Sequence, residues 1–106
     1  MWDIVSPVTQ DHDPIVYEGS RPQEALVINS GPGTFRIKAW HSLDSIEDEP
    51  QISVEVRPGD QRIVFGSLIR VAIEESSKSN PNFSAAGWRL VTPYIDPEYL
   101  RFRFRY

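Results

Sequence analysis

Residues 34–65 read TFRIKAWHSLDSIEDEPQISVEVRPGDQRIVF, and the alternation of apolar and polar side chains in this stretch decides the fold class. Phe35, Ile37 and Ala39 share one face of an extended segment, because successive side chains of a strand point to opposite sides of the sheet. The same period of two returns in ISVEV at residues 52–56. This period is typical of half-buried strands, so both segments are predicted strands.

A turn follows the second of these segments, at Pro58, Gly59 and Asp60. Proline presets the first central φ of a type II turn, and glycine accepts the positive φ at the second central position. The sequence therefore predicts a type II turn here.

Six further segments carry strand-like apolar patterns between turn residues. They are residues 14–18, 24–29, 61–65, 67–75, 85–91 and 99–106. Strands with one apolar face are stabilised when two sheets pack those faces together. We therefore expect an all-β protein, an antiparallel β-sandwich of seven or eight short strands, immunoglobulin-like or jelly-roll. Residues 24–106 are expected to form this single domain, and residues 1–23, with three prolines, an extended N-terminal arm.

Two longer stretches resemble a known family. VINSGPGTFRIKAW at residues 27–40 and ISVEVRPGDQRIV at residues 52–64 resemble the strand, N-x-G turn, strand, V-x-P-G-[DE], strand rhythm of bacterial immunoglobulin-like sandwich modules. The resemblance covers residues 24–75. It implies adhesion or assembly rather than the catalysis of a reaction.

The composition restricts the classes of partner. The chain has 106 residues and a net charge of −4, which opposes non-specific binding to nucleic acid or anionic lipid. It contains no cysteine, so a disulfide framework, a thiolate zinc site and a cysteine nucleophile are all excluded. We expect no signal peptide, no membrane span and a location in the cytoplasm or in an assembled particle.

Residues suited to metal binding or catalysis are few. His12 and His41 are the two histidines, and neither has the His-x-His spacing of a metal-binding jelly roll. On a strand His12 would point away from its aspartate neighbours, and the acidic residues 44–49 lack the D-x-D-x-D-G spacing of a calcium loop. GPG at residues 31–33 is not a phosphate-binding loop. We therefore predict no catalytic, cofactor-binding or metal-binding residue, and a protein that is not an enzyme.

The polar face of the strand at residues 34–41 is a candidate binding surface. It carries Arg36, Lys38 and Trp40, and tryptophan and arginine are common anchors of protein interfaces. The same tryptophan could instead stack on a sugar ring. A third possibility is that a loop or the N-terminal arm covers it.

The last eight residues, YLRFRFRY at 99–106, form the second candidate. The expected partner-binding residues are Tyr99, Arg101, Arg103, Arg105 and Tyr106. Leu100, Phe102 and Phe104 would bury against the sandwich or a partner, while the arginines pair with acids such as Glu55 or Glu74 or with a second subunit. Nucleic acid is disfavoured because the phenylalanines lie opposite the arginines, so bases and phosphates could not be met on one surface.

Taken together, these features predict a non-enzymatic protein–protein interaction or assembly module without a cofactor. It would act in a homo-oligomer or in a larger particle such as a phage or secretion structure. The alternative is a small carbohydrate-binding module that uses exposed aromatic residues.

Overall fold

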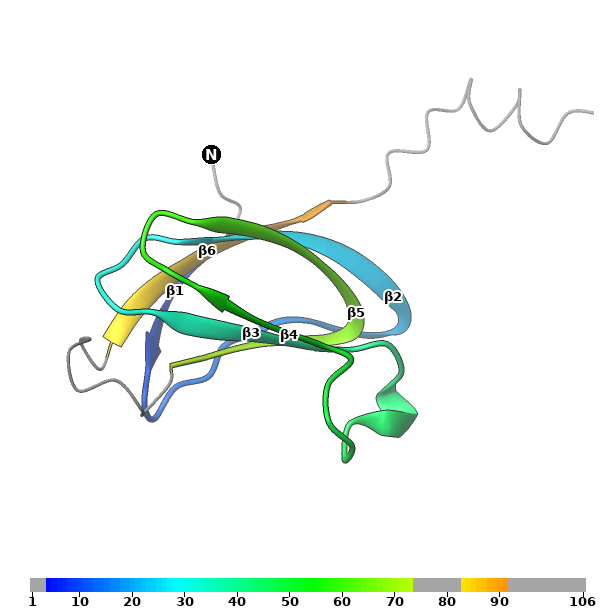
Figure 1. Ribbon diagram of the computed structural model, residues 1–106. Coiled ribbons are helices and arrows are strands. Elements are labelled where there is room, and N and C mark those ends of the chain that lie inside the picture. Colours follow the sequence, from blue (N-terminus) through cyan, green and yellow to red (C-terminus); the bar gives the residue numbers. More distant parts are fainter. Residues whose placement is uncertain (1–3, 74–82, 92–106) are drawn as a thin grey trace, which may run out of the picture.

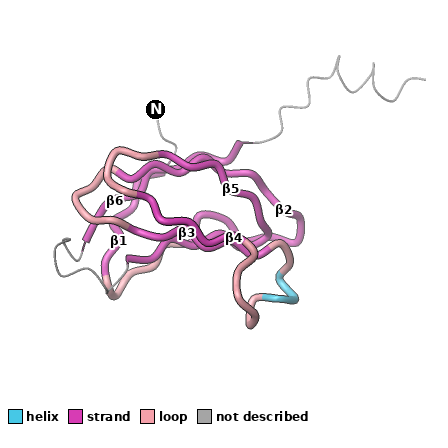
Figure 2. Tube along the Cα trace, viewed as in Figure 1, coloured by secondary structure: helices cyan, strands magenta, loops and turns pink. Residues whose placement is uncertain are grey.

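The computed structural model describes residues 4–73 and 83–91, which form one antiparallel sheet with the strand order β1-β6-β2-β5-β3-β4 (Figure 1). The six strands are β1 (Ile4–Thr9), β2 (Ile15–Asn29), β3 (Phe35–Trp40), β4 (Ile52–Val56), β5 (Gln61–Ile73) and β6 (Phe83–Val91). A short 3-10 helix, Leu43–Ser45, protrudes in the connection between β3 and β4 (Figure 2). The predicted all-β class is confirmed. No helix of the described residues is long and apolar enough to span a bilayer.

The described residues form six strands, because two pairs of predicted strands are continuous and β1 was not predicted. The strands predicted at residues 14–18 and 24–29 merge in β2, which begins at Ile15, and the two predicted on either side of Gly66 merge in β5, which is described as far as Ile73. A Cβ at Gly66 would lie 2.7 Å from the carbonyl oxygen of Trp40, so the close approach of the backbone explains the glycine. The strand predicted at residues 99–106 lies outside the described residues.

The N-terminal segment requires a correction, because residues 4–23 belong to strands β1 and β2 and their connection rather than to an extended arm. β1 pairs with β6 along its whole length, from Ile4 opposite Trp88 to Thr9 opposite Phe83. The side chain of Val8 is fully buried in the core. Proline is tolerated in β1 because this strand lies at the edge of the sheet.

The sheet is strongly bent, and the bend passes through β2 and β5. The register changes from Glu18 opposite Leu68 to Gln23 opposite Gly66, so four residues of β2 face one residue of β5. Extra residues on one strand bend it and increase its twist. As Figure 1 shows, the two strands curve so that the part of the sheet with β1 and β6 faces the part with β3 and β4.

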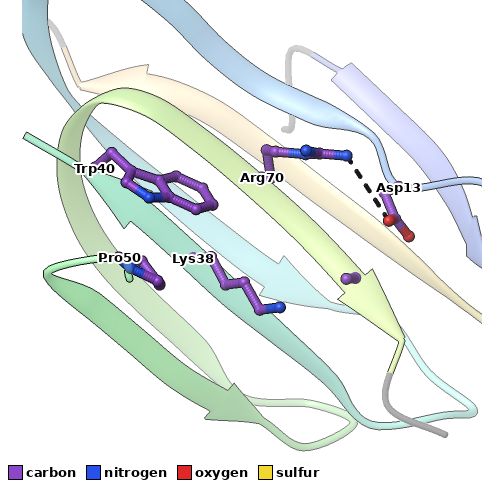
Figure 3. A pocket seen from close by; sticks show the side chains of 6 residues that line it. Asp13, Lys38, Trp40, Pro50 and Arg70 are labelled. Carbon is purple, nitrogen blue, oxygen red and sulfur yellow. Dashed lines mark ion pairs between the residues drawn. The ribbon is translucent and has the colours of Figure 1, made fainter. Parts of the chain in front are cut away.

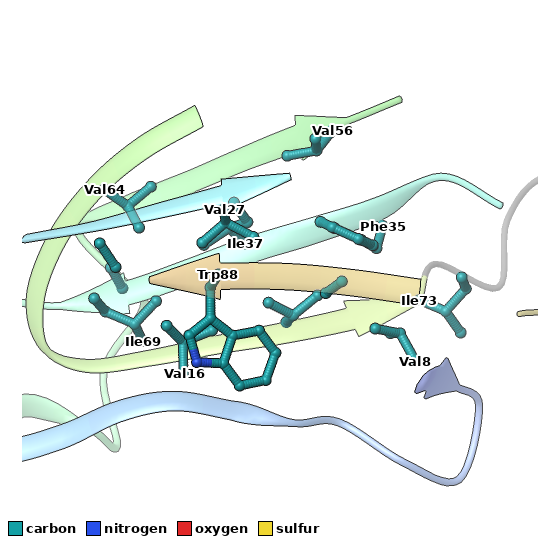
Figure 4. Packing of buried hydrophobic residues seen from close by; sticks show 14 residues of the cluster. Val8, Val16, Val27, Phe35, Ile37, Val56, Val64, Ile69, Ile73 and Trp88 are labelled. Atoms are coloured by element: carbon teal, nitrogen blue, oxygen red, sulfur yellow. The ribbon is translucent and has the colours of Figure 1, made fainter. Parts of the chain in front are cut away.

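The hydrophobic core lies between the two facing parts of the sheet (Figure 4). Phe35 and Ile37 of β3 are fully buried there, which confirms the alternation predicted for this strand, and Ile69 and Val71 of β5 are fully buried beside them. Trp88 of β6 contributes an indole ring from the opposite side. The core therefore joins strands from both ends of the sheet.

The predicted type II turn between β4 and β5 is confirmed. The backbone N–H of Asp60 donates to the carbonyl of Arg57 at 3.0 Å, and Gly59 adopts a φ of 89°. Residue Pro58 precedes this glycine, as the turn type requires.

Candidate functional site

The predicted binding residues of β3 lie on the outward face of that strand. Arg36 and Lys38 are partly exposed, between the buried positions of the core face. The Nη1 of Arg36 donates to the Oγ of Ser53 on β4 at 3.1 Å. The strand geometry thus presents both cations away from the core.

Trp40 is covered by the connection between β3 and β4. Its side chain is 8% exposed, and its Nε1–H donates to the carbonyl oxygen of Asp48 at 2.9 Å. Of the three possibilities considered for Trp40, this is the one in which a loop covers the side chain. The indole is therefore not an open stacking platform.

A pocket of about 270 Å³ lies beside this indole on the outer side of β3 and β5 (Figure 3). It is lined by Asp13, Lys38, Trp40, Pro50, Arg70 and Ala72. The sheet register places Lys38 directly opposite Arg70, so two cations share one wall. The sequence suggested Lys38 and Trp40 but missed Arg70 and Asp13, because the register that brings them together involves distant segments.

The positive charges of Lys38 and Arg70 in this pocket are only partly balanced by the carboxylate of Asp13. The Nη2 of Arg70 lies 3.8 Å from the Oδ2 of Asp13, and the two side chains are 44% and 39% exposed. An ion pair this long and this exposed contributes little to stability. With two cations and one carboxylate, the pocket favours an anionic group.

The residues weighed for metal binding lie in separate places. His12 has its Nε2 at 3.3 Å from the Oγ of Ser6, whereas the ring of His41 packs edge-on against Phe65 at a centroid distance of 6.1 Å. In the acidic connection, Ser42 caps the 3-10 helix by accepting from the N–H of Asp44. Among residues 4–73 and 83–91, no three His, Cys, Asp or Glu side chains gather as metal ligands would.

A second candidate is an apolar surface on the outward side of β1, β6, β2 and β5. Strand alternation places its residues opposite the core face of the same four strands. We call it the outer apolar surface and define it by Val5, Leu26, Ile28, Ile63, Phe65 and Phe83. The exposed fractions of Val5, Ile63 and Phe83 are 64%, 62% and 54%.

The register makes this surface continuous across the strands. Ile63 of β5 lies opposite Leu26 of β2, and Ile28 lies opposite Gly87 of β6, which in turn lies opposite Val5 of β1. A signal for this surface was present in the sequence, because residues 25–28 are apolar at every position. Unbroken apolar runs are typical of strands buried on both faces.

The outward side of the other half of the sheet has the opposite character. Arg36 lies between Glu55 of β4 and Ala72 of β5, and Lys38 lies between Ser53 and Arg70. Charged and polar side chains are expected where a sheet faces water. Among the described residues, the outward side around β3 therefore has the polar composition of a surface that faces water, whereas the outer apolar surface does not.

The other predicted partner-binding residues, Tyr99, Arg101, Arg103, Arg105 and Tyr106, lie outside the described part of the chain. Comparisons with protein-family models, with curated proteins and with solved structures found no match to this chain.

Proposed function

We propose that this protein is a non-enzymatic protein–protein interaction or assembly module that binds through the outer apolar surface. The observation that carries the proposal is the exposure of Val5, Ile63, Phe65 and Phe83 on one side of four adjacent strands. Contiguous exposed apolar patches of this kind mark interaction sites in soluble proteins.

The energetics favour covering this surface. Burying one large apolar side chain contributes about 1.5 to 3 kcal/mol relative to leaving it exposed. A partner that covered Val5, Ile63 and Phe83 would therefore gain several such contributions from side chains that are more than half exposed. Part of this gain offsets the entropy lost on association.

The resemblance to bacterial immunoglobulin-like modules also supports an assembly role. The strand expected at residues 99–106 would add a seventh strand and complete the sandwich that the sequence predicts. A larger particle, such as a phage or secretion structure, is one setting in which such a module would act.

The carbohydrate-binding alternative has less support. Sugar-binding platforms need an accessible aromatic face, whereas the indole of Trp40 is 8% exposed and its N–H already donates to Asp48. The cationic pocket beside it is better suited to an anionic group than to a neutral sugar.

Site-specific photocrosslinking in the producing cells tests the proposal. A benzophenone amino acid would replace Ile63 on the outer apolar surface or, as a control, Ile46, which is 45% exposed beside the 3-10 helix. We expect a defined protein adduct from position 63 and none from position 46. The absence of any protein adduct at position 63 would contradict the proposed function.

A further inference from the structure

We propose that a second copy of this chain covers the outer apolar surface, in a two-fold symmetric dimer that packs sheet against sheet. This inference rests on the proposed function and names the partner. In a two-fold dimer the same patch serves both subunits, so one surface is sufficient. Facing sheets in proteins pack about 10 Å apart through the side chains of their opposed faces.

The shape of the surface suits this arrangement. Its residues come from four neighbouring antiparallel strands, with Leu26 and Ile28 of β2 between the more exposed Ile63 of β5 and Val5 of β1. It is therefore a sheet face, not a narrow groove for a single peptide. A second sheet face of the same composition matches it in extent and polarity.

Two charged residues on this side of the sheet would fix how a second copy aligns with the first. Leu26 of β2 faces outward. Arg89 lies opposite Leu26, and Glu24 lies two residues before Leu26 in the same strand, so both charged side chains are on the outward side. They have opposite signs and occupy diagonal positions on adjacent strands. A two-fold axis that runs between the facing sheets, midway between these two positions and perpendicular to the line joining them, would bring the glutamate of one chain to the arginine of the other, and the reverse.

The charge distribution of the chain is compatible with self-association. The net charge of −4 repels a second copy, but among the described residues the outward side of these four strands contributes one acid, Glu24, and one base, Arg89, at this surface. The repulsion between copies therefore acts between more distant groups, where salt screens it. By contrast, the outward side of β3 and its neighbouring strands is polar, with Arg36 beside Glu55 and Lys38 opposite Arg70, and so offers little apolar area for a second copy to cover.

Light scattering coupled to size-exclusion chromatography of the full chain tests the dimer. We expect the wild-type mass to be that of two chains and to fall towards one chain on dilution. Ile63→Glu should raise the dimer dissociation constant about tenfold or more, because it places a charge in the apolar contact of both copies. Ile46→Glu adds the same charge at a similarly exposed isoleucine outside the surface and should leave the mass unchanged.

Charge reversal supplies a readout that a folding defect would not give. Glu24→Arg and Arg89→Glu should each weaken the dimer, and the double variant should restore it, with far-UV circular dichroism unchanged throughout. Restoration is expected because the cross-subunit pairs re-form with exchanged signs.

Several outcomes would overturn the second copy as partner. These are a single-chain mass at all concentrations, a dimer that survives Ile63→Glu, and a double variant that remains weakened. A dimer lost only on deletion of residues 92–106 would assign the contact to that segment instead and would also overturn the proposal. A photocrosslink from position 63 to another protein, with the purified chain monomeric, would leave the proposed function standing and the second copy refuted.

Discussion

The hydroxyl of Ser84 donates a hydrogen bond of 2.6 Å to the Oδ1 of Asn29, joining β6 to the end of β2 inside the core. The same Oδ1 accepts from the backbone N–H of Gly31 at 2.7 Å. The Nδ2 donates to the carbonyls of Gly33 and Val56, each at 2.8 Å. One fully buried amide therefore connects both halves of the sheet and the turn after β2.

Replacing Asn29 with alanine should lower the free energy of unfolding by about 3 kcal/mol or more, because several buried groups lose their partner at once. Ser84→Ala should cost about 1 kcal/mol, since the Oδ1 of Asn29 still accepts from Gly31. Urea denaturation of both variants measures the difference. Equal effects of the two substitutions would show that Asn29 is not the organising group.

Asn29→Asp separates hydrogen bonding from volume. The substitution keeps the size of the side chain but turns an oxygen towards the carbonyls of Gly33 and Val56, which also only accept. We expect a loss of stability at least as large as that of Asn29→Ala. A variant as stable as the wild type would contradict this description of the network.

Gly59→Ala should lower the free energy of unfolding by about 1 to 2 kcal/mol, because L-residues with a side chain resist a positive φ. Nothing lies within 4 Å of a Cβ at this position, so the effect would be purely conformational. Gly59→Asn is the matched variant and should cost less, since asparagine tolerates this region of φ. Thermal unfolding of the pair checks the order, and an alanine variant more stable than the asparagine variant would disprove it.

Trp40→Phe should loosen the connection between β3 and β4. The substitution removes the hydrogen bond to the carbonyl of Asp48, worth about 1 kcal/mol, and part of the wall of the pocket. Hydrogen exchange should increase in residues 42–50 more than in the rest of the chain. Trp88→Phe, in the core, is the control and should lower global stability without a selective effect on this segment.

Lys38→Gln should leave stability unchanged or raise it by a few tenths of a kcal/mol at low salt, because like charges directly opposite on neighbouring strands are destabilising. Asp13→Asn should lower stability by at most about 1 kcal/mol, since its ion pair with Arg70 is long and exposed. Both differences should shrink as salt is added. A large loss of stability in Lys38→Gln would mean that the two cations are not in conflict.

The sequence predicted local features better than the long-range arrangement. Alternation located β3 and β4, and the residue pair Pro58 and Gly59 identified the turn. These features depend on side-chain period and backbone preference alone. Pairing of β1 with β6 connects segments far apart in the chain, and no local pattern encodes it.

The candidate sites show the same contrast between local features, which the sequence predicted, and long-range contacts, which it did not. The outward position of Arg36 and Lys38 was predicted from the period of the strand, whereas their neighbour Arg70 required the register between β3 and β5. The sequence predicted separate strands at residues 14–18 and 24–29 and at residues 61–65 and 67–75, but the bulge and the close backbone contact at Gly66 allow β2 and β5 to be continuous. The outer apolar surface was encoded in the run Ala25–Ile28, although its extent depends on four strands coming together.

The most direct test is the solvent accessibility of isoleucine methyl groups in a concentrated solution of the full chain, measured by NMR with a soluble paramagnetic gadolinium chelate. In a single chain Ile63 is 62% exposed and Ile46 is 45% exposed, so relaxation without a partner would be stronger at Ile63. If a second copy covers the outer apolar surface, we expect the reverse order, with Ile63 shielded, Ile46 accessible, and the shielding lost on dilution. Stronger relaxation at Ile63 than at Ile46 in the concentrated solution would contradict it.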